Sequence, residues 1–127
     1  MNTADFDSLV TKAYAEIPGR FRRRLKNVAL IVEPEPSTDQ LARGRVRRGG
    51  TLLGLYEGRP LTRRSVFESF AMPDRITIFQ GPHERLATSP EHLAHLVAET
   101  VWHEVAHYFG MTEAQVRAAE RKHHRRY

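Results

Sequence analysis

The chain is organised around one stretch, Trp102-His103-Glu104-Val105-Ala106-His107-Tyr108-Phe109-Gly110. Two histidines four positions apart lie on one face of a helix, one turn apart, so both imidazole rings can reach a single zinc ion. The glutamate between them then lies beside the open coordination position of the metal. The stretch therefore predicts two metal ligands, His103 and His107, and the general base of a metal-dependent hydrolase, Glu104.

A long amphipathic helix is predicted to carry this pattern, from Ser89 to Phe109. Ser89 followed by Pro90 and an acidic residue is typical of a helix start, and Gly110 is a typical stop. One broad face of the helix is apolar and is formed by Leu93, Leu96, Val97, Thr100, Val101, Val105 and Tyr108.

The two histidines fall on the margin of this apolar face, at about 100° of rotation per residue, and Glu104 falls just inside it. A margin position suits a cleft in which a metal is partly buried and still reachable. The alternative is a purely structural helix, in which His103 and His107 lie at the core boundary and Glu104 bonds to the backbone. We favour the metal site because burying a glutamate without a purpose is costly.

Size and composition indicate one globular domain spanning residues 1–127. The 127 residues are 40% hydrophobic and 28% charged, and no apolar run is long enough to cross a membrane. Because the N-terminal segment Met1–Ser8 is polar and acidic, we expect no signal peptide and a cytoplasmic protein. The absence of cysteine excludes disulfides and thiolate zinc sites, so any metal must be held by histidine and carboxylate.

The chain is basic, with a formal net charge of +5 and a pI of about 10.1. Its arginines cluster at Arg20–Arg24, Arg43–Gly50 and Arg121–Arg126. Such clusters can bind nucleic acid, but they lack the interleaved aromatic residues of single-strand binders and match no nucleic-acid motif. We interpret them as solvated surface and keep nucleic-acid binding as an alternative.

The remaining periodicities predict a second helix and several short strands. Phe6–Ile17 has the spacing of an amphipathic helix that ends at Pro18-Gly19. Strands are expected at Val28–Val32, Thr51–Glu57, Ser65–Phe70 and Arg75–Gln80. In the last of these, Ile76 and Ile78 would share one side. Gly54 would mark a bulge or a close approach of the backbone.

Residues 34–50 are expected to form a long polar connection, and a last helix is predicted at about Thr112–His124. The order of elements predicts an α+β fold, with a small mixed β-sheet of three to four strands packed against the motif helix and the N-terminal helix.

Three other histidines are not expected to share the metal. His92 and His95 lie upstream on the same helix and should face solvent, and His83 is placed in a loop after Gly81-Pro82. Tyr108 points into the apolar face, so we expect it to pack in the core rather than to assist catalysis.

Nearly the whole chain resembles the minimal zincin-like metallopeptidases, a family of small and mostly bacterial proteins. The resemblance is carried by the first helix, the Asn27–Val32 strand, Leu53–Gly58, Pro73–Phe79 and, most specifically, His103–Glu113. It implies a reduced zincin catalytic domain, with a sheet packed on the motif helix, and a zinc-dependent peptidase activity that is itself inferred from the motif.

Within the wider zincins, the metzincin pattern HExxHxxGxxH ends in a third histidine, and here Glu113 occupies that position. A carboxylate there is chemically acceptable as the third zinc ligand. In the alternative interpretation, Thr112 caps the last helix, Gln115 completes a capping box, and Glu113 merely suits the positive helix end. Glu120 is then the fallback ligand. The chain is also too short after the motif to contain the Met-turn of full metzincins.

These expectations combine into one reaction. Zn²⁺ held by His103, His107 and Glu113 would activate a water, and Glu104 would take its proton as the water attacks a peptide carbonyl. The substrate would be an extended peptide or protein segment lying along a sheet edge, either Ser65–Phe70 or Arg75–Gln80. The alternatives are a catalytically silent zinc-binding interaction module and a basic nucleic-acid-binding protein.

Overall fold

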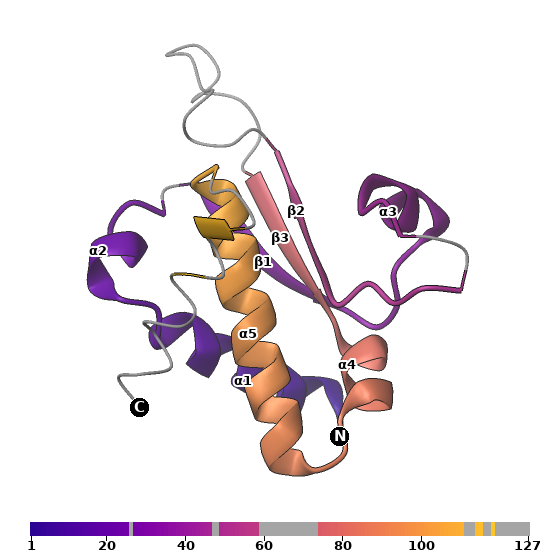
Figure 1. The fold of residues 1–127 in the computed structure, drawn as a ribbon. Helices are drawn as coiled ribbons and strands as arrows, with labels where there is room; N and C mark the ends of the chain where they lie inside the picture. Colours follow the sequence, from indigo (N-terminus) through magenta and orange to yellow (C-terminus); the bar gives the residue numbers. More distant parts are fainter. Residues whose placement is uncertain (26, 47–48, 59–73, 111–113, 116–117, 119–127) are drawn as a thin grey trace.

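The protein is a mixed α+β structure in which helices pack against a small sheet, as predicted (Figure 1). The structure, a computed structural model, describes residues 1–25, 27–46, 49–58, 74–110, 114–115 and 118. Its elements in chain order are α1 (Thr3–Ala15), α2 (Gly19–Arg22), β1 (Val28–Glu33), α3 (Thr38–Arg43), β2 (Gly54–Glu57), β3 (Asp74–Phe79), α4 (Gln80–Leu86) and α5 (Pro90–Tyr108).

The sheet has the strand order β1-β3-β2, with β1 parallel and β2 antiparallel to β3. It is therefore a mixed sheet, as predicted. The prediction that Arg75–Gln80 supplies an edge was wrong, because β3 has a neighbouring strand on each side. Every residue of β3 except Arg75 is buried, which is the pattern of a central strand rather than of a half-exposed edge.

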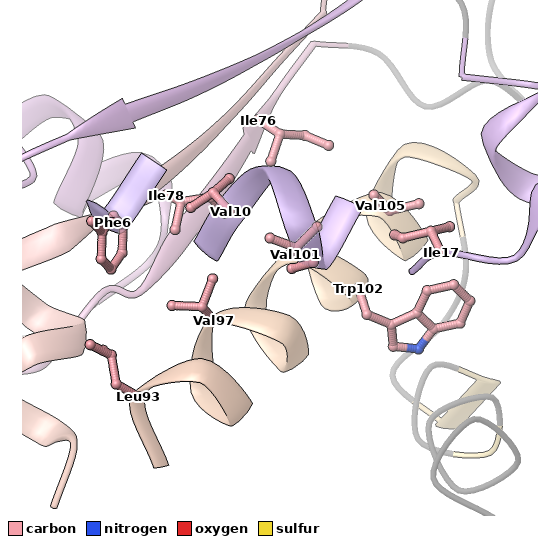
Figure 2. Packing of buried hydrophobic residues seen from close by; sticks show 11 residues of the cluster. Phe6, Val10, Ile17, Ile76, Ile78, Leu93, Val97, Val101, Trp102 and Val105 are labelled. Carbon is pink, nitrogen blue, oxygen red and sulfur yellow. The ribbon is translucent and has the colours of Figure 1, made fainter. Parts of the chain in front are cut away.

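The core lies between β3 and the helices α1 and α5, which lie together on one face of the sheet (Figure 1). Figure 2 shows the side chains that meet there, contributed by α1 and the turn after it, by β3 and by α5: Phe6, Val10, Ile17, Ile76, Ile78, Leu93, Val97, Val101, Trp102 and Val105. Ile76 and Ile78 face this cluster together, as their alternation predicted. Burial of this one apolar face fixes the rotation of α5, and with it the direction of the motif residues.

Both predicted long helices are confirmed. The ends of α5 are those that its sequence indicated, whereas α1 begins three residues before and ends two residues before the predicted Phe6–Ile17. The Ser89 hydroxyl accepts a hydrogen bond from the His92 N–H at 3.0 Å, so Ser89 caps α5. Gly110 has a φ of 71°, the left-handed conformation that commonly terminates a helix.

Residues 34–50 contain a helix, α3, and the prediction of a polar connection without helix was therefore wrong. Ser37 and Gln40 form a reciprocal capping box, in which the Ser37 hydroxyl accepts from the Gln40 N–H and the Gln40 side chain accepts from the Ser37 N–H. The Ser-x-x-Gln spacing was a usable signal, and the surrounding glycines and arginines obscured it. Figure 1 shows α3 on the far side of β2 from α5.

Two predicted elements lie wholly or largely outside the described residues. They are the strand at Ser65–Phe70 and most of the last helix at Thr112–His124, of which Ala114, Gln115 and Ala118 are described and helical. None of the described helices is long and apolar enough to cross a membrane.

His83 was predicted to lie in a loop, and this was wrong: it lies in α4 and is fully buried. Its Nδ1–H donates to the Phe79 carbonyl at 2.7 Å, because a carbonyl can only accept. His83 Nε2 and the Thr100 hydroxyl are hydrogen-bonded at 2.9 Å, in a direction set by the protonation of the ring, because the single hydroxyl proton can also go to the Leu96 carbonyl at 2.8 Å. His83 therefore ties the start of α4 to the middle of α5. Burial lowers the pKa of His83 below its usual value, against the opposing effect of the nearby Phe79 and Leu96 carbonyls.

We expect this buried histidine to make the fold acid-sensitive. Because the pKa of His83 is lower in the folded protein than in the unfolded chain, the unfolded state takes up a proton first as the pH falls below about 6.5. The free energy of unfolding of the metal-free protein should therefore decrease from pH 7 to pH 5, with a contribution from His83 of at most about 1.4 kcal/mol per pH unit. Urea unfolding of wild type and His83→Gln at both pH values measures it. Equal losses in the two proteins would contradict the assignment.

Candidate metal and catalytic site

The structure brings His103, Glu104 and His107 together on α5. The histidine rings lie with their centroids 4.7 Å apart and their planes at 72°. One potential ligand atom from each of the three residues lies within 4.8 Å of the others. Both histidines are half-buried and Glu104 is buried, which is the placement expected for the margin and the inside of the apolar face.

Glu104 is held by the backbone of β2. Its Oε1 accepts a hydrogen bond from the Tyr56 N–H at 2.8 Å. The Phe79 N–H donates to the Leu53 carbonyl, which sets the alternation of the β2–β3 ladder. The N–H and C=O groups of Gly54 and Tyr56 therefore point away from β3, toward the side of β2 on which the described residues place no further strand, called here the outer edge of β2. Glu104 thus lies at the outer edge of β2.

Gly54 allows β2 to approach α5 this closely. A Cβ atom at position 54 would lie 2.7 Å from Thr100 Cγ2 and 3.1 Å from Glu104 Cγ. The expected close backbone approach is thereby confirmed, and it occurs directly beside the candidate base.

A groove runs along the outer edge of β2 and past the motif residues. It has two hollows, of about 410 and 540 Å³, and Leu52, Gly54, His103 and Glu104 line both of them. The smaller hollow continues to Thr51 and Glu99, and the larger continues to Tyr56 and His107. Residue numbers rise from the smaller hollow to the larger one along both the β2 segment and α5. His103 and Glu104, which line both hollows, therefore lie midway along the groove.

The second wall of the larger hollow comes from the end of α3, through Arg43, Gly44 and Arg45. Arg43 forms an ion pair with Glu57, which connects α3 to β2. From the sequence, these arginines were expected to be solvated surface charge, and the structure places them at the site. These arginines reach the site because they lie at the end of α3. The capping pattern at Ser37, which indicates α3, was therefore the sequence signal that could have placed them there.

The turn after α3 places Arg45 in an unusual backbone conformation. The Arg45 and Val46 N–H groups donate to the Ala42 and Leu41 carbonyls, the pattern of a Schellman motif. Arg45 occupies its left-handed position with a φ of 56°, where glycine is usual and another residue costs about 1 kcal/mol. Gly44 lies one residue earlier because a Cβ there would be 2.8 Å from Leu52.

The donor set suits a metal ion such as zinc. The two imidazoles each offer a ligand atom within 4.8 Å of the other and of a Glu104 oxygen, and the sequence has no cysteine to compete with them. The proposed third ligand, Glu113, and its alternative, Glu120, both lie outside the described residues. Within the described part of the chain, no other histidine or acidic side chain joins this group.

The other candidate residues lie away from the groove. Tyr108 is buried, donates from its hydroxyl to the Arg24 carbonyl and packs edge-on against Tyr56, so its expected core role is confirmed. His95 is exposed and pairs with Glu99 at 2.8 Å. His92 is only partly exposed, and its Nδ1 accepts from the Thr88 N–H at 3.0 Å.

Comparison with known proteins places this geometry in context. Residues 25–123 match a family model described as a zincin-like metallopeptidase. A solved structure of a conserved hypothetical protein from Thermo thermophilus is similar, with a TM-score of 0.57 and 25% sequence identity over 86% of this chain and 94% of that chain. No significant match is found among curated proteins.

Adding a methyl group at Gly54 should disrupt the contact that seats Glu104. We expect Gly54→Ala to lower the free energy of unfolding by about 1–3 kcal/mol, since the new Cβ must displace α5 or β2. Urea unfolding measures the loss. Gly19→Ala is the matched control, because its Cβ meets only the guanidinium ends of two long arginine side chains. Equal stabilities of the two variants would show that β2 is not closely packed at Gly54.

Proposed function

The chain belongs to the zincin-like metallopeptidase family, and on that premise we propose that it is a zinc-dependent peptidase with Glu104 as its general base. One observation carries the proposal: a glutamate held at the outer edge of a strand shares a groove with two histidines that can bind a metal. This arrangement brings together a metal ligand set, a base and a surface for an extended chain.

His103 and His107 would hold the zinc, and Glu113 would complete the protein ligands, with Glu120 as the alternative. When bound, zinc activates a water molecule and polarises the substrate carbonyl. The short helical spacing fixes both imidazoles on one turn of α5, whose rotation is set by the core. The site is therefore built on a helix that is packed in the core, which favours a defined geometry.

Glu104 is suited to accept and return a proton. The hydrogen bond from the Tyr56 N–H fixes the orientation of its carboxylate. That bond alone would also be expected of a glutamate with a purely structural role. The two histidines in the same groove are what favour catalysis, because a structural carboxylate has no need of metal-binding neighbours.

The substrate in this proposal is an extended peptide or protein segment that lies along the outer edge of β2. The backbone groups of Gly54 point toward that edge and would pair with the peptide as a further strand does. This replaces the edge first expected at Arg75–Gln80. Pairing there would bring a peptide bond past His103 and Glu104, midway along the groove.

Two other functions are less well supported. A zinc-bound interaction module without turnover would use the same histidines but would not need Glu104. A nucleic-acid binder would need its basic clusters on one surface, whereas α2 and α3, which carry or adjoin the two described clusters, lie on opposite sides of the molecule (Figure 1).

We expect removal of either histidine to abolish stoichiometric zinc binding. His103→Ala and His107→Ala should each weaken zinc affinity by at least about 100-fold, because a direct ligand contributes more than an outer-shell partner does. Metal analysis after incubation with zinc and dialysis measures occupancy, and His95→Ala is the control on the exposed face of the same helix. Unchanged occupancy in both motif variants would exclude this zinc site.

The third ligand is assigned by the same measurement on Glu113→Gln and Glu120→Gln. The variant that loses affinity identifies the ligand, and we expect it to be Glu113. Loss in Glu120→Gln alone would transfer the role to Glu120. Wild-type affinity in both variants would leave the two histidines without a carboxylate partner and would contradict the three-ligand proposal.

Glu104→Gln should abolish turnover while the protein still binds zinc. The amide cannot accept the proton, so cleavage of a peptide library should fall by about 100-fold or more. Glu91→Gln is the matched control, since Glu91 lies in the first turn of the same helix and is exposed. Equal cleavage by wild type and Glu104→Gln would exclude the proposed base. Full zinc occupancy without cleavage by either protein would favour the interaction module.

A further inference from the structure

The larger hollow of the groove has a basic wall beside the motif residues. Arg43 and Arg45 line this hollow together with His103, Glu104 and His107. The opposite hollow is lined by Glu99 and, among the described residues, by no arginine or lysine. The groove is therefore asymmetric in charge along its length, and a peptide lying in it would meet the positive wall only on the His107 side.

The two arginines differ in what they are available to do. Arg43 is paired with Glu57, so its charge is largely neutralised within the protein. Arg45 is exposed, and its side chain has no hydrogen bond or ion pair with any residue in the described part of the chain. Arg45 is thus the arginine of this wall that can bind an incoming anion.

Backbone geometry supports a role for Arg45 as well. It occupies the left-handed position of the Schellman motif, where glycine would be the favourable residue for stability alone. An arginine at this position is held at a fixed point beside the groove, because the motif closes α3 and the Arg43–Glu57 pair anchors α3 to β2.

We propose that Arg45 selects substrates by binding a carboxylate of the peptide, on the His107 side of the groove. The planar guanidinium matches a carboxylate in shape and can donate two hydrogen bonds to it. The carboxylate can come from an aspartate or glutamate side chain or from the C-terminus of the peptide. This assignment rests on the proposed peptidase function and adds a substrate class to it, acidic extended peptides.

The test measures binding and cleavage with paired peptides. Acetylated and amidated peptides of Ala, Val and Leu carry one Glu, or one Gln as the matched control, at each position in turn. A second set lacks Glu and ends in either a free or an amidated C-terminus. Binding to zinc-loaded Glu104→Gln is followed by fluorescence anisotropy, and cleavage by zinc-loaded wild type is followed by mass spectrometry.

We expect Glu peptides to bind about fivefold more tightly than Gln peptides at the best position, which is the scale of an exposed ion pair. The Glu-to-Gln affinity ratio should fall toward one in Arg45→Gln, and also for wild type in about 0.5 M salt. Arg45→Glu should instead prefer peptides that carry Lys in place of Glu. Arg45→Gly should lose the preference with a thermal midpoint at least as high as that of wild type, which separates recognition from folding. Arg23→Gln, an equal change of charge at α2, should keep the wild-type ratio.

The outcomes separate the two proposals. Cleavage without any preference for Glu or for a free C-terminus would overturn the role of Arg45 and leave the peptidase intact. Preferential binding that depends on Arg45, with no cleavage of any peptide, would support the carboxylate site and overturn the peptidase. No peptide binding at all would overturn both. If Arg45→Gln weakened binding of a mixed oligonucleotide while the peptide ratio stayed unchanged, Arg45 would serve nucleic acid instead.

Discussion

The close approach of β2 to α5 at Gly54 is the constraint on which the rest of the site depends. Without a side chain at Gly54, the strand comes near enough for the Tyr56 N–H to reach Glu104. The core between α5, α1 and β3 fixes how the helix is rotated, so this packing and the contact at Gly54 together determine where the motif faces. Glu104 is thus positioned by two packing contacts and one hydrogen bond. The hydrogen bond from the Tyr56 N–H also gives the buried carboxylate a polar partner.

The groove is assembled from three elements that are distant in sequence. α5 supplies the metal-binding side chains, the outer edge of β2 supplies backbone groups, and the end of α3 supplies the basic wall. The Arg43–Glu57 pair and the contact of Gly44 with Leu52 connect α3 to the strand region. The shape of the groove therefore depends on contacts between the three elements, and the metal-binding side chains and the basic wall come from different ones, α5 and the end of α3.

The sequence predicted the parts of the fold that depend on local pattern. The spacing of apolar residues located α1 and α5, and the predicted capping residue Ser89 lies where α5 begins. What it did not predict depends on contacts between distant segments. The central position of β3 follows from pairing with both β1 and β2, which the alternation within Arg75–Gln80 could not reveal. His83 was assigned to a loop because its burial depends on α4 and on the distant Thr100. Arg45 lies at the site only because α3 brings it there.

The short outer edge of β2 also affects how the protein meets other chains. An exposed strand edge is a template for pairing, and it invites aggregation when it is long and flat. Here the strand has four residues, one of its outward N–H groups is occupied by Glu104, and α5 and the end of α3 rise on either side of it. These walls interrupt the flat edge that another sheet would need for pairing, because a partner strand must first fit between α5 and the end of α3. The recess that would admit a peptide in the proposed function thus also disfavours edge-to-edge association with the sheets of other molecules.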